Sequence, residues 1–390
     1  MASAKNSHFI DLTKINLFET IYDVKYKEVI AWKEQNPGRK AIALFPVYVP
    51  SELIHSYNHL PVNIYGGGEE VSISHADAIL GSFICSISKS TTELLLSQEE
   101  FQKAFDGFVF PFICDVARNL SGIFGRRSTK PAYMLHLAQN FQSPSGITFL
   151  AKEYQRLVST LFPDENLNLE NLRESIKLFN HNRQLHRDLY QLRWEKPWNV
   201  PLKEMYEIMR VGSTLTVETH NRLLQQKMDQ IKLRDGRTKD AIRVVVTGNF
   251  CEQPPLDFID LIEQVGCYVI DDDFMIGRRF ISKDVNPDAE NILEELAKCY
   301  IVNGAKIATR FHQGEKGTVI LDRVKQANAN GVIFLTAKFC EPALDDLVLQ
   351  QQALYENNIP YVHIEFEERG SGYELIRLSL ETFVESMLFD

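Results

Sequence analysis

The feature that most constrains this chain is a repeated unit in which a short apolar run ends in a loop and a helix follows. In the C-terminal part, apolar runs at 243–247, 268–271, 331–335 and 361–364 alternate with helical segments at 256–265, 289–302, 318–328 and 343–357. Such alternation is typical of a mostly parallel sheet with helices on both faces. In the N-terminal part, runs at 40–47, 61–65, 107–112 and 132–137 are interpreted as strands of a second sheet.

A helical segment separates the two sets of strands. From 146 to 231 apolar residues recur at helical spacing, and Trp194 and Trp198 are expected to pack this segment. We therefore predict an α/β protein of two doubly wound, mostly parallel α/β domains joined by a helical insert. The predicted boundaries are 1–37 for an N-terminal arm and helix, 38–150 for the N-terminal domain, 151–239 for the insert and 240–390 for the C-terminal domain. One helix is expected over 17–35, and 74–83 is either helix or strand.

Composition excludes several functional classes. The chain has 390 residues, of which 44% are hydrophobic and 24% charged, as in an ordinary globular protein. Its net charge of -10, with no basic stripe, argues against nucleic acid as a partner. No apolar run is long enough to span a membrane, and residues 1–12 lack the pattern of a signal peptide, so a cytoplasmic protein is expected.

Four of the six cysteines lie where a predicted element gives way to the next, namely Cys85, Cys114, Cys251 and Cys340. In a cytoplasmic chain of this size, thiols or metal ligands are more common than disulfides. A thiol at a helix N-terminus is favoured as thiolate, and strand ends in one parallel sheet converge. The pattern therefore indicates a metal or cluster site. The alternative is a set of small buried apolar side chains, because the spacings are not those of zinc ribbons.

One carboxylate is best placed to share that site. Glu52 follows the apolar run at 40–47, with Ser51 and His55 beside it. The alternative is that Glu52 only serves the start of a helix after Pro50, where an acidic residue is favoured.

Other charged groups leave similar alternatives. The run 271–273 of three aspartates either binds metal or substrate, or forms a turn paired with Arg278 and Arg279. Arg118, Arg126 and Arg127 either contact the phosphates of an anionic ligand or offset the acidic surface. The chain contains neither a P-loop nor a dinucleotide fingerprint, so any ATP should be held by another subunit.

Taken in order, several segments resemble the 2-hydroxyacyl-CoA dehydratase / benzoyl-CoA reductase family over nearly the whole chain. They are Pro50-Ser-Glu52-Leu-Ile-His55, Gly66-Gly-Gly68-Glu, Cys85, Cys114-Asp115 with Arg118, Val246-Thr-Gly248, Asp272-Asp273 with Gly277-Arg278, Gly331-Val-Ile, Cys340-Glu341 and Asn358-Ile-Pro360. Within the family, the stretch 248–255 is most similar to the smaller, C-type catalytic subunit of ATP-dependent benzoyl-CoA reductase. The dehydratase ending T-R-x-E-A-F is replaced by a different sequence around Arg377, which leaves the role of that residue open.

The resemblance implies a [4Fe-4S] cluster held by Cys85, Cys114 and Cys340, with its fourth iron open or bound by another type of ligand. Cys251 lies outside this pattern. It is either a residue that contacts the ligands without binding iron or a substitute ligand. Glu52 is the first and His55 the second expected proton donor. The implied partners are a larger homologous catalytic subunit, ATPase activator subunits that carry the ATP, ferredoxin as electron donor and an acyl-CoA substrate, but no nucleic acid and no membrane.

The implied activity is an oxidoreductase that acts on CH-CH groups with an iron–sulfur protein as donor. It would dearomatise benzoyl-CoA to a cyclohexadiene-carbonyl-CoA in anaerobic aromatic degradation. Two alternatives stay open. One is a subunit of a radical 2-hydroxyacyl-CoA dehydratase, which consumes no net electrons per turnover. The other is a non-catalytic scaffold partner of a homologous catalytic subunit.

Overall fold

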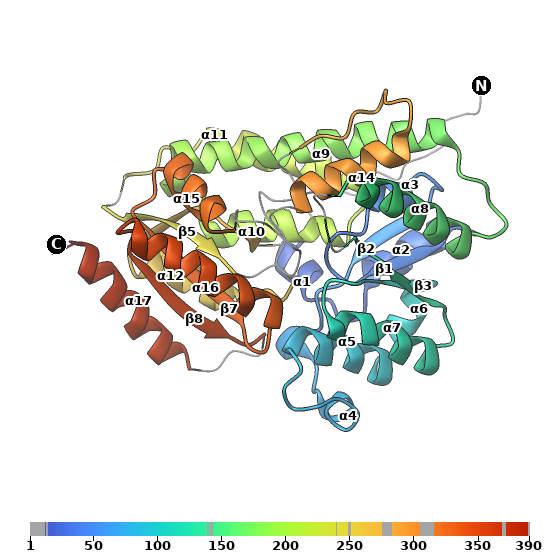
Figure 1. The fold of residues 1–390 in the computed structure, drawn as a ribbon, viewed down its shortest axis with the longest axis horizontal. Coiled ribbons are helices and arrows are strands. Elements are labelled where there is room, and N and C mark those ends of the chain that lie inside the picture. The colour runs from blue at the N-terminus through green and yellow to red at the C-terminus, as the bar shows by residue number, and fades with distance from the viewer. Residues whose placement is uncertain are drawn as a thin grey trace.

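The computed structural model describes residues 12, 15–138, 140, 143–238, 240–248, 251–274, 283–304, 316–368 and 372–388. It contains two four-stranded sheets surrounded by helices (Figure 1). All strand pairings among these residues are parallel. The predicted fold class of two mostly parallel α/β units is thereby confirmed. None of the described helices is both long enough and apolar enough to cross a membrane.

The N-terminal sheet has the order β2-β1-β3-β4. Its strands are β1 (Ala41–Leu44), β2 (Leu60–Asn63), β3 (Gly107–Pro111) and β4 (Ala132–Leu135). The helices around it are α2 (Lys27–Gln35), α3 (Ser51–His55), α4 (Ser74–Asp77), α5 (Ser86–Ser97), α6 (Glu99–Ala104), α7 (Asp115–Arg127) and α8 (Pro144–Leu161). Every residue of β1 and β3 is buried, which explains why these strands are continuous apolar runs.

The C-terminal sheet repeats this order as β6-β5-β7-β8. Its strands are β5 (Ile242–Thr247), β6 (Cys267–Asp271), β7 (Gly331–Ala337) and β8 (Tyr361–Phe366). Helices α12 (Leu256–Gln264) and α17 (Tyr373–Leu388) contribute to one apolar cluster, and α15 (Lys316–Ala327) and α16 (Glu341–Glu356) contribute to another. The two clusters lie on opposite faces of the sheet, which is the doubly wound arrangement.

Residues 151–239, predicted as a helical insert, include the end of α8 and the whole of α9 (Leu169–Glu195), α10 (Leu202–Arg210) and α11 (Val217–Lys232). Helix α9 has 27 residues and is therefore roughly 40 Å long, and it runs past both sheets (Figure 1). Near its C-terminal end, the Arg193 guanidinium donates to the Val269 carbonyl oxygen, and Trp194 Nε1 donates to the Ile270 carbonyl oxygen. Trp194 and Trp198 thus pack the insert against β6 of the C-terminal sheet.

Two helices differ from the sequence-based expectation. The single helix predicted over 17–35 is divided into α1 (Leu17–Ile21) and α2, because Tyr26 adopts a left-handed conformation with φ 52°. The Asp23 carboxylate stabilises this break by accepting from the backbone N–H groups of Lys25 and Lys27. Helix α14 (Ile292–Gly304) follows β6 in the chain but packs against α8 of the N-terminal half. Residues 74–83, predicted as helix or strand, begin with helix α4.

Candidate metal centre between the two sheets

The carboxyl ends of the two sheets face each other. In the N-terminal sheet, β1 and β3 are neighbours, and the chain continues from β1 to one side (β2) and from β3 to the other side (β4). The strands β5 and β7 have the same arrangement in the C-terminal sheet. In such sheets, the loops that follow the two central strands flank a crevice. Cys114 follows β3, Cys251 follows β5 and Cys340 follows β7. The Cys251 thiol reaches the loop after β1, where it donates to the Pro46 carbonyl oxygen at 3.6 Å. The loops that follow β1 and β5 therefore meet where the two halves of the molecule adjoin.

Three of the thiols lie at helix N-termini. Cys85, Cys114 and Cys340 are the N-cap residues of α5, α7 and α16. At α7 the backbone N–H of Ala117 donates to Cys114 Sγ at 3.4 Å, so the sulfur replaces the usual oxygen cap. The residue before Cys340, Phe339, has φ 64°, which turns the chain sharply between β7 and α16. The prediction that these cysteines mark junctions between elements is confirmed.

The structure brings together the four thiols that the sequence singled out. Cys251 is buried, whereas Cys85, Cys114 and Cys340 are partly exposed. Burial raises the pKa of Cys251 well above its ordinary value, and the charges of the other three cysteines raise it further. The side chains of all four cysteines belong to or pack against one apolar cluster, so residues from opposite ends of the chain lie in one region. Cys267 and Cys299 are absent from this group of interacting thiols.

The expected thiolate form is not favoured by the protein alone. Burial raises the pKa of Cys85 to about 12, and the nearby Glu252 carboxylate acts in the same direction. At Cys114 the backbone N–H groups of the helix lower the pKa, but burial raises it by more. The helix N-termini are therefore too weak to ionise these sulfurs. Without a nearby positive charge these thiols are expected to be neutral at pH 7, and a bound metal would be one way to stabilise the thiolate form.

The donor set can be compared with what different metals need. Among the described residues, no group of three or more His, Cys, Asp or Glu side chains is arranged around one point as the ligands of a single ion would be. A four-iron cluster bonds each thiolate through a different iron atom, so its ligands stand further apart. Cys85, Cys114 and Cys340 are partly exposed sulfur donors, which is the ligand type that iron–sulfur clusters use.

Two buried carboxylates adjoin the thiols, and sequence reasoning missed both. Glu252 is 3% exposed and interacts electrostatically with Cys85 and Cys340. Burial, followed by the charge of Glu368, raises the pKa of Glu252 to about 8. Glu368, which follows β8, is 7% exposed. The only sequence signal for the pair was the glycine run at 66–68, whose backbone one of these carboxylates contacts.

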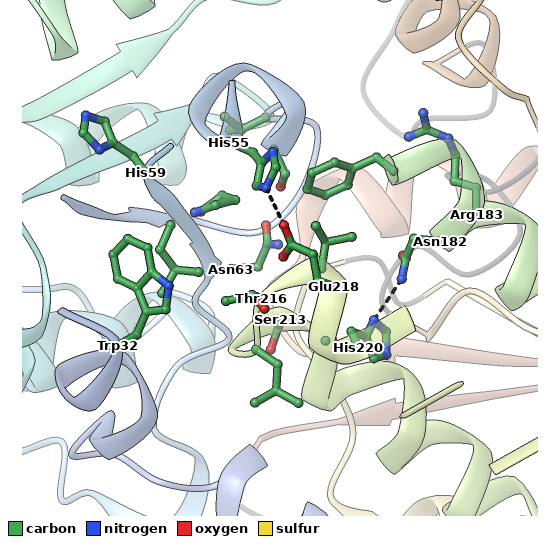
Figure 2. A pocket seen from close by; sticks show the side chains of 18 of the residues that line it. Trp32, His55, His59, Asn63, Asn182, Arg183, Ser213, Thr216, Glu218 and His220 are labelled. Atoms are coloured by element: carbon green, nitrogen blue, oxygen red, sulfur yellow. Dashed lines mark hydrogen bonds and ion pairs between the residues drawn. The ribbon is translucent and has the colours of Figure 1, made fainter. Parts of the chain in front are cut away.

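Helix α3 separates the three predicted catalytic residues. Glu52 is fully buried, and its Oε1 accepts from Arg183 Nη1 of α9 at 2.7 Å. Ser51 and His55 instead line a cavity. His55 Nδ1 lies 2.8 Å from Ser175 Oγ, and Nε2 lies 3.2 Å from Glu218 Oε1 (Figure 2). Their catalytic roles stay predictions, but of the two expected proton donors only His55 faces open space.

This cavity of about 260 Å³ lies beside the thiol site. The loop after β1, strand β2, and helices α9 and α11 form its walls. Tyr65 lines the cavity and also interacts electrostatically with Cys251, so the cavity and the thiols are neighbours. Polar and aromatic side chains on the walls include Trp32, His55, His59, Asn63 and Thr216 (Figure 2), and Arg39 also lines the cavity.

Two further histidines on the cavity wall are neutral. Burial lowers the pKa of His186 to about 4 and that of His220 to about 3. His220 Nε2 bonds the Ile208 carbonyl oxygen, so it carries the proton, and Nδ1 accepts from Asn182 Nδ2 at 3.1 Å. These rings serve as fixed hydrogen-bonding groups at neutral pH.

Three of the remaining charged candidates, Asp271, Asp273 and Arg118, have protein partners. Asp271 and Asp273 form ion pairs with Arg323 of α15, which supports the turn paired with arginine, although the expected partners 278 and 279 lie outside the described residues. Arg118 pairs with Asp115 at 3.4 Å. Arg126 and Arg127 are exposed at the end of α7, and their predicted alternatives stay open.

The position of Arg377, left open by the sequence, is also described. It lies on the surface of α17, where Nη1 is 3.9 Å from Glu381 Oε1. This pairing gives no indication of a role at the thiol site.

Comparison with known proteins now assigns the chain to a family. Residues 46–387 match the family model described as 2-hydroxyglutaryl-CoA dehydratase, D-component. The chain is 37% identical over 375 residues to the C-type subunit of benzoyl-CoA reductase from Thauera aromatica, a match that covers 95% of this chain and 96% of that protein. It is 26% identical to the lactoyl-CoA dehydratase subunit beta of Anaerotignum propionicum, covering 90% and 92% of the two chains. It is 23% identical to the (R)-2-hydroxyglutaryl-CoA dehydratase subunit beta of Acidaminococcus fermentans, covering 91% and 94%. The chain therefore belongs to the 2-hydroxyglutaryl-CoA dehydratase D-component family, which includes subunits of benzoyl-CoA reductase and of 2-hydroxyacyl-CoA dehydratases.

Proposed function

We propose that this chain is the iron–sulfur subunit of an ATP-dependent, ferredoxin-linked benzoyl-CoA reductase. The observation that carries the proposal is the convergence of Cys85, Cys114 and Cys340 at the facing ends of two parallel sheets. The 37% identity to a benzoyl-CoA reductase subunit over 95% of the chain favours this reductase within the family. A homologous larger subunit, ATPase subunits and ferredoxin would complete the enzyme.

In this proposal the three cysteines hold a [4Fe-4S] cluster, which would supply electrons of low potential to the acyl-CoA. The chain's own residues would exclude water and position the reactants. Cys251 lies behind the ligands, where its bond to Pro46 ties the loops after β1 and β5 together. Tyr65 adjoins both the thiols and the cavity, whose aromatic and apolar walls suit an aromatic acyl group.

Proton delivery would come from the cavity side. His55 is partly exposed there, and its bond to Glu218 orients the ring toward that carboxylate. Glu52 is enclosed by the protein and paired with Arg183, so it would act by holding α3 against α9. We therefore rank His55 above Glu52 as proton donor, which reverses the order expected from the sequence.

The test uses the chain purified with its natural partners in the absence of oxygen. Iron content and the EPR spectrum after dithionite are compared between wild type and the variant Cys114→Ala, with Cys267→Ala as a matched control outside the thiol group. We expect loss of one cluster's iron and signal in the first variant alone. Unchanged iron and spectrum in Cys114→Ala would contradict the proposal and favour a scaffold whose thiols are structural.

A second function is supported by the identities of 26% and 23% to two dehydratase subunits. A radical dehydratase would use the same cluster to eliminate water. An assay with benzoyl-CoA and ATP, in which the amount of reductant consumed per product formed is measured, separates the two functions. A reductase consumes electrons in proportion to product, whereas a dehydratase acts on 2-hydroxyacyl-CoA and consumes none per turnover.

A further inference from the structure

We propose that Glu252 is a positioning residue that holds Cys85 in place from the opposite half of the molecule, before any metal binds. Together with Glu368 it forms what we call the carboxylate clasp. The proposal concerns the protein without metal, and only its consequence for cluster binding rests on the proposed function. The clasp would hold the two halves of the molecule together at the thiols, so that the cysteines are already positioned before metal binds.

The first part of the clasp is the Glu252 carboxylate, which comes from the loop after β5 in the C-terminal half. Its Oε2 accepts from the backbone N–H of Ile87 at 3.1 Å, and the Ser86 side chain lowers the pKa of Glu252, so it also lies close to this carboxylate. Both residues lie in the first turn of α5, directly after its N-cap Cys85. The position of Cys85 relative to Cys340 therefore depends on a side chain that crosses between the halves.

The second part is Glu368, which follows β8 and also belongs to the C-terminal half. Its backbone N–H donates to Glu252 Oε1 at 2.9 Å, so the two residues are joined directly. Its own carboxylate accepts from the backbone N–H of Gly68 at 2.9 Å and from Ser90 Oγ at 2.6 Å. Gly68 and Ser90 belong to the N-terminal half, and Ser90 lies on the same helix α5.

The glycine run makes this approach possible. Gly66 has φ +77°, and a Cβ built on it would lie 2.2 Å from Ser90 Oγ and 2.6 Å from Glu368 Oε1. A side chain at this position would force the carboxylate away from α5. The run at 66–68 thus has a structural use that its sequence alone did not reveal.

Two neighbouring buried carboxylates are unfavourable for folding in themselves, because each loses its hydration and repels the other. Here, hydrogen bonds from three backbone N–H groups and a serine hydroxyl compensate part of that cost. Apolar residues would fill the same space at lower cost. The arrangement is explained if it fixes the geometry of the thiols that it surrounds.

The hydrogen-bonding pattern supplies a matched pair of variants. Both oxygens of Glu252 accept from backbone N–H groups, so Glu252→Gln must place its NH₂ against another donor and lose one bond. Glu368→Gln keeps both contacts, because its NH₂ can donate to the Ser90 hydroxyl while its oxygen accepts from Gly68. The variant Glu252→Asp retains the carboxyl group but is too short to reach both N–H groups.

The experiment measures the full-length chain with its natural partners, first freed of iron by a chelator. Hydrogen–deuterium exchange measures how well the backbone N–H groups at the α5 N-terminus are protected. The rate of alkylation by iodoacetamide measures how accessible the Cys85 thiol is. For Glu252→Gln and Glu252→Asp we expect about tenfold faster exchange at Ile87 and faster alkylation of Cys85. For Glu368→Gln we expect wild-type values of both quantities.

Unchanged exchange and alkylation in both Glu252 variants would overturn the proposal. An equal increase in Glu368→Gln would also overturn it, since the effect would then follow charge rather than position. If Glu252→Gln fails to fold, Glu252→Asp gives the same readout. Reconstitution of the wild-type chain with iron and sulfide tests the proposed function separately from the clasp. If no cluster forms, the proposed function is contradicted. The measurements on the metal-free chain still decide whether the clasp exists.

Discussion

The buried ion pair between Glu52 and Arg183 allows one prediction to be worked out in detail. Glu52 is fully buried, and the Arg183 side chain is 4% exposed. Glu52 Oε2 has no hydrogen-bond partner among the described residues. The substitution Glu52→Gln would therefore remove the buried counter-charge of Arg183 and bury an additional NH₂ group in its place.

The magnitude follows from what remains around Arg183. Removing one partner of a buried pair costs about 3–5 kcal/mol of unfolding free energy. In this protein, Asn180 still accepts from Arg183 Nη2 at 2.6 Å, and Asp284 lies 3.8 Å from Nε. Because these groups retain part of the stabilisation, we expect the lower end of the range, about 3 kcal/mol.

Urea unfolding, followed by circular dichroism on the metal-free chain, measures this loss. Glu174→Gln is the matched control, because its pair with Lys177 is exposed and should change stability by less than about 0.5 kcal/mol. The double variant Glu52→Leu/Arg183→Met removes both charges and should recover most of the stability. A loss below about 1 kcal/mol in Glu52→Gln, together with abolished turnover, would refute the structural role and restore Glu52 as the proton donor.

Three other predictions concern separate parts of the molecule. The pKa of His186 is lowered to about 4 and that of His220 to about 3, so as pH falls below about 6.5 these histidines take up protons in the unfolded chain before they do so in the folded one. The free energy of unfolding, measured with urea, should therefore be highest near pH 7.5 and decline between about pH 6.5 and 4. The variant His220→Gln should show a smaller decline. Gly66→Ala should lower the melting temperature more than Gly38→Ala, since both have positive φ but only the first added Cβ meets other atoms, at 2.2 Å. Cys114→Ala should leave the melting temperature of the metal-free chain within a few degrees of wild type, because the sulfur is partly exposed, whereas the iron-loaded form should lose its metal-dependent stabilisation.

Much of the fold was predictable because central parallel strands are buried on both faces and leave continuous apolar runs in the sequence. The residues of β3 and β7 show this pattern, and all of them are buried. The break at Tyr26 was not predictable, since it depends on a side-chain cap from Asp23 that competes with helix periodicity. The attachment of α14 to the N-terminal half was missed because an apolar helix face does not specify its partner.

The candidate site was predictable only where a local signal existed. Cysteines at strand-to-helix junctions can be recognised in sequence, because strand ends of one sheet converge. The pairs Glu52–Arg183 and Glu252–Ile87 join residues 131 and 165 positions apart, and nothing near either residue indicates the partner. The domain boundaries and the catalytic roles of Ser51, Glu52 and His55 stay predictions.

The division of the thiols between the two halves has a consequence for how the protein is made. A ribosome adds about 5–20 residues per second, so Cys340 leaves it roughly 10 to 50 seconds after Cys85. During that interval the nascent chain carries Cys85 and Cys114 without their counterpart from the C-terminal half. Metal delivered to the growing chain would find an incomplete set of donors. Under the proposed function, cluster loading would therefore have to wait until Cys340 has been synthesised. A chain truncated before β7 would lack this third ligand.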